Sequence, residues 1–159
     1  MAVVSEIVAS WRTPRRVIAQ HLAHRATEPF AFSLLVAFLV LAFVSQWPGM
    51  SRGAYLQPEV PLTQRMLAAG LALLASIPFW YALAGISRLV AQRLGGKGSY
   101  IGARLSLFMA LLAVGPFMLV QGIISGFAGA GLVANGTGVL VLCGFVYVWI
   151  NMLIASETA

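Results

Sequence analysis

Aspartate is absent from this 159-residue sequence, and the four acidic residues are all glutamates scattered along the chain. Paired carboxylates, which general acid–base catalysis and sites for hard cations require, are therefore not available. A single cysteine, Cys143, excludes an internal disulfide framework and any zinc or iron–sulfur site built from several cysteines. We expect no catalytic residue, no cofactor and no bound metal.

Charge of either sign is scarce. Only 9% of the residues are charged, against about 25% in a typical soluble domain, while 60% are apolar. Ten basic and four acidic side chains cannot give a chain of this length a surface that favours water. The composition therefore predicts an integral membrane protein, with lipid around most of the chain.

Four long apolar runs agree with this prediction. We expect membrane-spanning helices at residues 30–47, 66–87, 105–124 and 136–156. Each run is close to the roughly 20 residues that a helix needs to cross about 30 Å of hydrocarbon. Pro48-Gly49 is expected to close the first run. Because backbone groups in lipid must satisfy one another, the runs predict an all-α fold, with a four-helix bundle over residues 30–156.

The basic residues are concentrated on one side of these predicted spans. Eight of the ten lie before the first span or between the second and third: Arg12, Arg15, Arg16, Arg25, Arg88, Arg93, Lys97 and Arg104. Because basic residues favour the cytoplasmic side of a membrane, both termini are expected there. The net charge of +6 is then a topology signal with a weak attraction to anionic lipid, and it forms no basic stripe for nucleic acid.

Residues 1–29 form a separate cytoplasmic segment with the pattern of two short amphipathic helices. The apolar positions of the first helix are Val4, Ile7, Val8 and Trp11, and those of the second are Val17, Ile18 and Leu22. Thr13 followed by Pro14 is typical of a helix start. These helices would lie in the interface of the membrane, pack on the protein's own cytoplasmic face, or do both. The candidates for contact with lipid headgroups are Trp11, Arg15, Arg16, Arg93 and Lys97.

The second and third predicted spans share a local sequence. Residues 72–87 and 110–125 are identical at 8 of 16 positions, and Pro78-Phe79 aligns with Pro116-Phe117. We expect Pro78 and Pro116 to kink two antiparallel helices near mid-membrane. Proline-interrupted helices of inverted topology also form the binding sites of secondary transporters. Simple kinks are favoured here, since no ionisable residue lies inside a predicted span.

Small residues four positions apart indicate two candidate faces for helix contact. The rows are Ala68, Ala72 and Ser76 in the second span, and Gly122, Gly126 and Ala130 at the end of the third. We expect both rows to pack the bundle internally rather than to form a dimer. Asn151, one turn after Tyr147, would hydrogen-bond to another helix or reach toward the membrane surface.

Three further features carry little chemistry. His21 and His24 could share a metal, but no third ligand is evident, so histidines that face headgroups are favoured. Cys143 is expected to be a small core residue of its span. Asn135-Gly136-Thr137 matches the glycosylation sequon on the predicted outer side, but it lies too close to the membrane to be modified.

The connection between the second and third spans contains the glycine-rich, basic stretch Leu94–Tyr100 (LGGKGSY). It lacks the GxxxxGK[ST] spacing of a phosphate-binding loop, and no strand precedes it. We expect a flexible cytoplasmic hairpin in which Gly95 ends the preceding helix.

Residues 87–100 (SRLVAQRLGGKGSY), followed by Pro116 after an apolar stretch, resemble the signature of the Yip1-domain membrane proteins. The Trp11-x-x-Pro14 pattern is similar to that of bacterial members, and the likeness covers about residues 10–155. Yip1 domains usually have five spans, whereas this sequence ends after the fourth predicted one. The eukaryotic branch binds Rab-type small GTPases and carries an Asp-Leu-Tyr-Gly-Pro motif. Without aspartate that motif is impossible, so we do not expect a small GTPase partner.

Nine arginines to one lysine, with abundant alanine and glycine, are typical of a GC-rich bacterial genome, so we expect a bacterial inner membrane. The expected function is that of a non-catalytic accessory, assembly or organising subunit, which binds a larger membrane complex or itself. One alternative is a small transporter or channel element built around Pro78 and Pro116. A second is a lipid-organising protein that uses the N-terminal segment and the basic loop.

Overall fold

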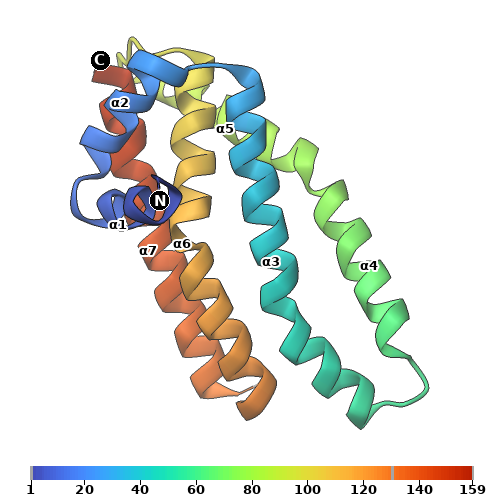
Figure 1. Ribbon diagram of the computed structural model, residues 1–159. Coiled ribbons are helices and arrows are strands. Elements are labelled where there is room, and N and C mark those ends of the chain that lie inside the picture. Colours follow the sequence, from blue (N-terminus) through green and yellow to red (C-terminus); the bar gives the residue numbers. More distant parts are fainter. Residues whose placement is uncertain (1, 130, 159) are drawn as a thin grey trace.

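The computed structural model describes residues 2–129 and 131–158, with side chains described from residue 7 onward apart from that of residue 25. Every regular element in this part of the chain is an α-helix (Figure 1). The helices are α1 (Ala2–Arg12), α2 (Pro14–Arg25), α3 (Glu28–Leu56), α4 (Leu62–Ala75), α5 (Ile77–Arg93), α6 (Tyr100–Ala128) and α7 (Leu132–Thr158).

Four stretches are long and apolar enough to cross a membrane, namely α3, α4 together with α5, α6, and α7. Each contains one predicted span, so the prediction of four long apolar helices is confirmed. The first helix does not close at Pro48-Gly49 as expected, because α3 continues to Leu56. Pro48 packs closely against Gly126 of α6. α7 likewise extends beyond its predicted span, since it begins at Leu132.

The four stretches form a row rather than a closed bundle (Figure 1). α3 and α6 are the central pair, and α6 also packs along α7. α4 contacts α3 at the other end of the row and has no buried residue. The core is filled mainly by side chains of α3 and α6, including Leu35, Phe38 and Phe108. α6 is therefore the most enclosed helix, and α4 the most exposed of the long ones.

The close approach of α3 and α6 depends on glycines. A β-carbon at Gly122 would overlap with the carbonyl oxygen of Ser45, and one at Gly126 would overlap with Pro48. Small residues allow helix backbones to come this close in lipid, where dispersion contacts must replace the hydrophobic effect. The glycine row thus holds α6 against the part of α3 that contains its proline.

The two prolines that were expected to kink helices behave differently. Pro78 lies in the first turn of α5, which separates from α4 at Ser76 and runs in another direction (Figure 1). The Ser76 hydroxyl donates to the Leu73 carbonyl oxygen at 2.6 Å and accepts from the Trp80 indole N–H at 3.1 Å, which stabilises the break. α6 instead continues through Pro116 as one helix.

The helices α1 and α2 pack on the side of α6 and α7. The Trp11 indole N–H donates to the carbonyl oxygen of Ala113, near the middle of α6, at 3.0 Å. Val17 and Ile18 of α2 are buried in the main core, on the side that the amphipathic pattern predicts. Thr13 precedes α2 as expected, although its side chain makes no capping hydrogen bond. Protein, rather than lipid, therefore covers the apolar side of α2 and most of the Trp11 ring.

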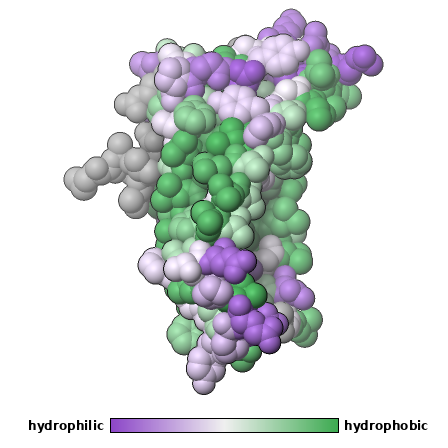
Figure 2. Space-filling view, turned by 90° about the vertical axis from the view of Figure 1, so that its right-hand side faces the viewer, coloured by the Kyte–Doolittle hydropathy of each residue, from purple (hydrophilic) through white to green (hydrophobic). Residues whose placement is uncertain are grey.

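Charged residues gather where α5 and α7 end and where α3 and α6 begin. These helix ends meet because successive long stretches run in opposite directions (Figure 1). Arg88, Arg93, Lys97 and Arg104 all lie in or next to them. Figure 2 shows hydrophilic residues at this upper end of the molecule and a largely hydrophobic band below it. We call this the charged end.

Candidate functional site

The glycine-rich loop between α5 and α6 is packed against α7 and is not the free hairpin that we expected. α5 is followed by Gly95, whose φ of 90° is strained for any other residue. The N–H groups of Gly95 and Gly96 donate to the carbonyl oxygens of Gln92 and Ala91 at 3.1 and 2.9 Å. These are the two hydrogen bonds of a Schellman motif. The prediction that Gly95 ends the helix is confirmed.

Glu157, in the last turn of α7, is the group around which this loop folds. Its carboxylate accepts hydrogen bonds from the Arg88 guanidinium at 3.0 Å and from the Gly98 N–H at 2.9 Å. The Lys97 N–H donates to the Glu157 carbonyl oxygen at 3.1 Å. A β-carbon at Gly96 would overlap with the Glu157 carboxylate, and one at Gly98 would overlap with the backbone beside it. We call Arg88, Glu157 and the loop residues 95–98 the anchor.

The ion pair in the anchor is almost fully buried. The side chains of Arg88 and Glu157 are 10% and 7% exposed. Removing one partner of such a pair leaves an uncompensated charge and costs about 3–5 kcal/mol. The Arg88 Nε and Glu157 Oε1 atoms have no hydrogen-bond partner among the described residues. The anchor therefore ties the end of α5 to the end of α7, with one polar atom on each side chain left unpaired.

A second ion pair at the charged end joins Arg104 of α6 to Glu28 of α3. The Arg104 guanidinium also lies 5.3 Å from the centre of the Tyr81 ring of α5, within the range of a cation–π contact. Partly exposed pairs of this kind contribute about 1 kcal/mol or less. Arg104 is therefore a secondary link beside the anchor.

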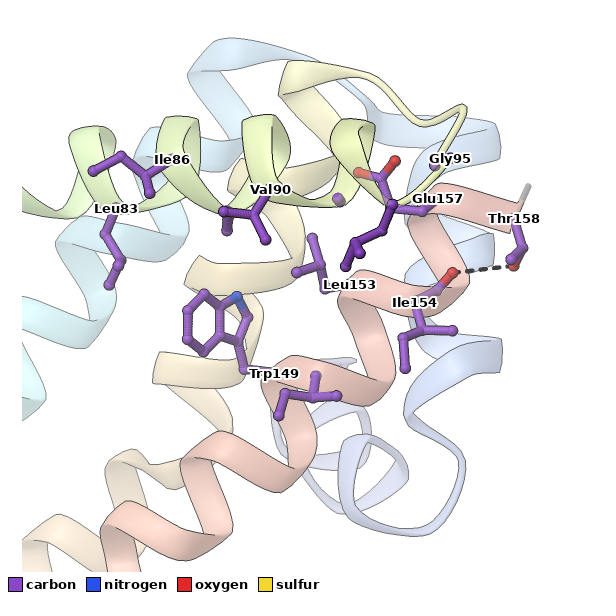
Figure 3. Close-up of a pocket in the computed structure, with 14 residues that line it drawn as sticks. Leu83, Ile86, Val90, Gly95, Trp149, Leu153, Ile154, Glu157 and Thr158 are labelled. Carbon is purple, nitrogen blue, oxygen red and sulfur yellow. Dashed lines mark hydrogen bonds between the residues drawn. The ribbon is translucent and has the colours of Figure 1, made fainter.

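An apolar groove of 720 Å³ separates α5 from the last turns of α7, next to the anchor (Figure 3). Ile86 and Val90 line it from α5 and are both more than half exposed, while Trp149 and Leu153 line it from α7. The Trp149 indole N–H is buried and has no acceptor in the described part of the chain. Arg93 follows Ile86 by seven residues, which places it on the same face of α5. We call this the α5–α7 groove.

A second cavity, of 820 Å³, lies between α4 and α7 on the face formed by α3 and α6. We call it the α3–α6 cleft. Its lining contains polar side chains from both central helices, among them Ser45, Gln46, Gln121 and Ser125. Uncharged amides of this kind hydrogen-bond between helices in lipid, so the cleft is chemically suited to a further helix.

Arg65 is the charged residue among those that line the α3–α6 cleft. Its guanidinium donates to the carbonyl oxygens of Val60 and Gln57 at 3.1 and 3.4 Å, and to the Gln57 side chain at 3.2 Å. Arg65 therefore holds the connection between α3 and α4 and lines the cleft together with uncharged amides and hydroxyls.

The small-residue row of α4 does not pack the molecule internally. Ala68 and Ala72 are exposed. α4 contacts α3 through another face, where Gly70 lies beside Phe43 and Leu73 packs against the core. The expectation of internal packing was therefore wrong for these two alanines, because the helix is rotated to present a different stripe to α3.

The remaining contact candidates lie in three different places. Gly122 and Gly126 face α3, as described above, and Ser76 lines the α3–α6 cleft at the break between α4 and α5. Ala130 lies outside the described residues. Asn151 accepts a hydrogen bond from Arg15 of α2 at 3.4 Å, which is the contact with another helix that was one of its two expected roles.

Trp11 was predicted to contact headgroups, but the protein itself engages it. Its ring packs edge-on against Phe117, with centroids 5.0 Å apart, and a β-carbon at Gly144 would overlap with it. The structure corrects this prediction, since the indole finds its acceptor and its apolar contacts on α6 and α7. Val4, from the same predicted face, lies outside the described side chains.

The other headgroup candidates are at or near the charged end. Arg15 is partly engaged with Asn151, whereas Arg16, Arg93 and Lys97 are exposed. No ion pair of these three cations occurs among the described residues. They therefore remain available to an anionic ligand.

Cys143, the two histidines and the sequon do not form a functional site. Cys143 is exposed, which corrects its expected place in the core, because its side of α7 has no neighbouring helix. The ring of His21 lies against that of Phe30, and the residues that the structure describes contain no cluster of three metal-binding side chains. The Thr137 hydroxyl bonds to the backbone of α7 itself, so the sequon lies on a helix.

The anchor and the cleft were not predicted from the sequence. Glu157 is the one acid after Glu59, and it lies on the same predicted side as the basic glycine loop. That coincidence was the available signal for the anchor. Gln46 and Gln121 belong to different helices, and no pattern in the sequence pairs them. Only the packing of α3 on α6 brings them into one cavity.

Comparison with known proteins found no matching family model, no matching curated protein and no matching solved structure. The function has to be inferred from the chain's own geometry. The candidate sites in the described residues are the anchor, the α5–α7 groove and the α3–α6 cleft.

Proposed function

We propose that this chain is a non-catalytic membrane protein that acts as an accessory or organising subunit by accepting a transmembrane helix of another chain in the α3–α6 cleft. The observation that carries the proposal is an open row of helices with amides on the floor of its cleft. Gln46 and Gln121 lie there between the exposed apolar sides of α4 and α7. A bound helix would cover those sides and offer polar partners to the amides.

The shape of the molecule supports this proposal. α4 has no buried residue, and its Leu73, which lines the cleft, is only partly covered. On α7, Leu142 lines the cleft and is more than half exposed. Exposed apolar surface of this extent on a helix that crosses a membrane must be covered by lipid or by another helix.

We further propose a bacterial inner membrane, with the charged end and both termini on the cytoplasmic side. The bias of eight basic residues out of ten supports this orientation. Arg16, Arg93 and Lys97 would then meet anionic headgroups. We also propose kinship with the Yip1-domain proteins. It is supported by residues 87–100, whose glycines have defined places in the anchor, and a small GTPase partner is not part of the proposal.

Site-specific photo-crosslinking in native membranes tests the helix-binding role. Leu142 lines the cleft, whereas Leu140 is on the same helix, similarly exposed and outside the lining. We expect a photoreactive residue at position 142 to form a protein adduct and one at position 140 to form much less. Adduct mass identifies the partner as a second copy or another protein. No adduct at position 142, or equal adducts at both positions, would overturn the proposal.

A small transporter or channel element is the second candidate. The observation in its favour is the polar lining of the cleft, which the broken segment at Ser76 and Pro78 borders. Liposomes loaded with a pH-sensitive dye and separate liposomes loaded with potassium ions test this role. Flux that Gln46→Leu and Gln121→Leu abolish would support transport. If liposomes with the protein lose protons and potassium ions no faster than protein-free liposomes, conduction of both ions is excluded.

A further inference from the structure

We propose that the α5–α7 groove is a binding site for an anionic phospholipid, with one acyl chain between the two helices and the phosphate beside Arg93 and Lys97. This site shares no lining residue with the α3–α6 cleft, although Trp149 of the groove stacks on Phe145 of the cleft, with ring centroids 5.5 Å apart. The proposal does not depend on a helix partner, and its failure would leave the proposed function of the cleft unaffected.

The size of the groove suits a single lipid chain. Its volume of 720 Å³ is within the range of about 300–1,000 Å³ that is common for sites of small ligands. The α7 residues that line it extend from Trp149 to Thr158. This stretch of α7 is about 14 Å long, a length along which one acyl chain can lie.

The lining of the groove is apolar where a chain would lie. Ile86 and Val90 of α5 face Trp149 and Leu153 of α7 across it (Figure 3). Ile86 and Val90 are 56% and 54% exposed, so burying them under an apolar chain lowers the free energy. Leu94, at the mouth, is 84% exposed. Such a surface, open beside helices that could cross a membrane, is accessible to a lipid from the side.

Polar groups at the groove match an anionic glycerolipid. The Trp149 indole N–H lacks an acceptor, although buried indoles usually have one. A small shift of neighbouring flexible side chains would let a lipid ester oxygen reach it. Arg93 and Lys97 are exposed cations without an ion-pair partner in the described chain. The Glu157 carboxylate is occupied by the anchor, so its negative charge is compensated and does not repel a phosphate.

Native mass spectrometry of the full chain, released from detergent micelles that contain phosphatidylcholine or phosphatidylglycerol, tests the site. We expect phosphatidylglycerol to stay bound to the wild type and phosphatidylcholine to be lost. Val90→Trp fills the groove and should lower retained phosphatidylglycerol about tenfold. Leu89→Trp is the matched control, since Leu89 is next in sequence and equally exposed but does not line the groove. Leu153→Trp blocks the groove from α7, which gives a second test should Val90→Trp fail to fold.

The charge of the mouth is tested separately. Arg93→Gln with Lys97→Gln should remove the preference for phosphatidylglycerol, whereas Arg16→Gln, on α2 and away from the groove, should keep it. Added salt should weaken the preference in the wild type. Three results would each overturn the proposal: equal retention in Val90→Trp and Leu89→Trp, equal retention of the two lipids by the wild type, or a bound polypeptide that Val90→Trp displaces.

Discussion

Residues 72–87 and 110–125 have half of their positions in common but adopt different structures. The first stretch contains the break between α4 and α5, whereas the second is a continuous part of α6. A Pro-Phe pair occupies the same place in each, with Pro78 in the first and Pro116 in the second. The comparison shows that the contacts around a proline decide whether it ends a helix or is accommodated within one.

The surroundings of the two prolines differ on every side. α6 is enclosed by α3 and α7, and most of its residues from position 102 to position 115 are buried. Pro116 removes the N–H that would bond to the Leu112 carbonyl, and Trp11 donates to the next carbonyl, that of Ala113. α4 has a neighbour on one face alone, and Ser76 satisfies the backbone of the break locally. A side-chain hydrogen bond therefore lies next to the freed carbonyl in both stretches, donated by another helix near Pro116 and from within the same segment near Pro78.

The largest expected effect comes from the anchor, which holds the end of the broken segment to α7. Glu157→Gln leaves Arg88 buried without its counter-charge, and we expect the free energy of unfolding to fall by about 3 kcal/mol. Unfolding by SDS, followed by circular dichroism, measures the change. Glu59→Gln, at an exposed position between α3 and α4, is the control and should be neutral. An equal effect of the two substitutions would show that the buried pair does not hold α5.

The next effect concerns the enclosed helix. Gly122→Ala places a methyl group against the Ser45 carbonyl, and we expect a loss of about 2–3 kcal/mol as α3 and α6 are forced apart. Gly85→Ala, in α5, meets no atom within 4 Å and should be neutral or stabilising by up to about 1 kcal/mol. Thermal unfolding in one detergent compares the two. Similar melting temperatures for both variants would contradict the close approach of α3 and α6.

A smaller effect is expected at the side chain that supports α6 near its proline. Trp11→Phe keeps the ring but removes the donor to Ala113, and we expect a loss of about 1 kcal/mol. Trp47→Phe, in the exposed part of α3, is the matched control. Proton exchange of the indole N–H, followed by nuclear magnetic resonance, provides a second measurement. Exchange as fast for Trp11 as for Trp47 would show that the indole does not bind to α6.

The smallest change in stability, less than about 1 kcal/mol, is expected when the prolines themselves are replaced. Pro78→Ala restores an N–H that can join α4 to α5, so the distance between spin labels at positions 67 and 94 should increase. Pro116→Ala should leave the path of α6 unchanged, as labels at positions 100 and 127 would show. A larger change in the distance between the α6 labels than between the α4 and α5 labels would contradict this prediction. It would show that Pro116, rather than Pro78, changes the path of its segment.

The glycines show how much the spacing of small residues can predict about helix packing. The spacing of Gly122 and Gly126 identified a contact face, but an identical spacing of Ala68 and Ala72 identified an exposed one. Spacing places residues on one side of a helix without saying which side meets a neighbour. Trp11 shows the same limit, because its amphipathic pattern fits a membrane surface and a protein surface equally well. The anchor joins residues 69 positions apart, a separation at which local patterns carry no information.

By itself, the sequence determined that the chain is helical, that it has four apolar stretches long enough to cross a membrane, and that charge is confined to their ends. These properties follow from how single side chains and backbone groups are solvated. The composition of the sequence and the lengths of its apolar runs are enough to predict them. Tertiary structure alone decided that the helices form an open row, that Pro78 separates two helices while Pro116 lies within one, and that Glu157 gathers the glycine loop. Those outcomes depend on which surfaces meet, and the free energy of a contact is set by both partners together.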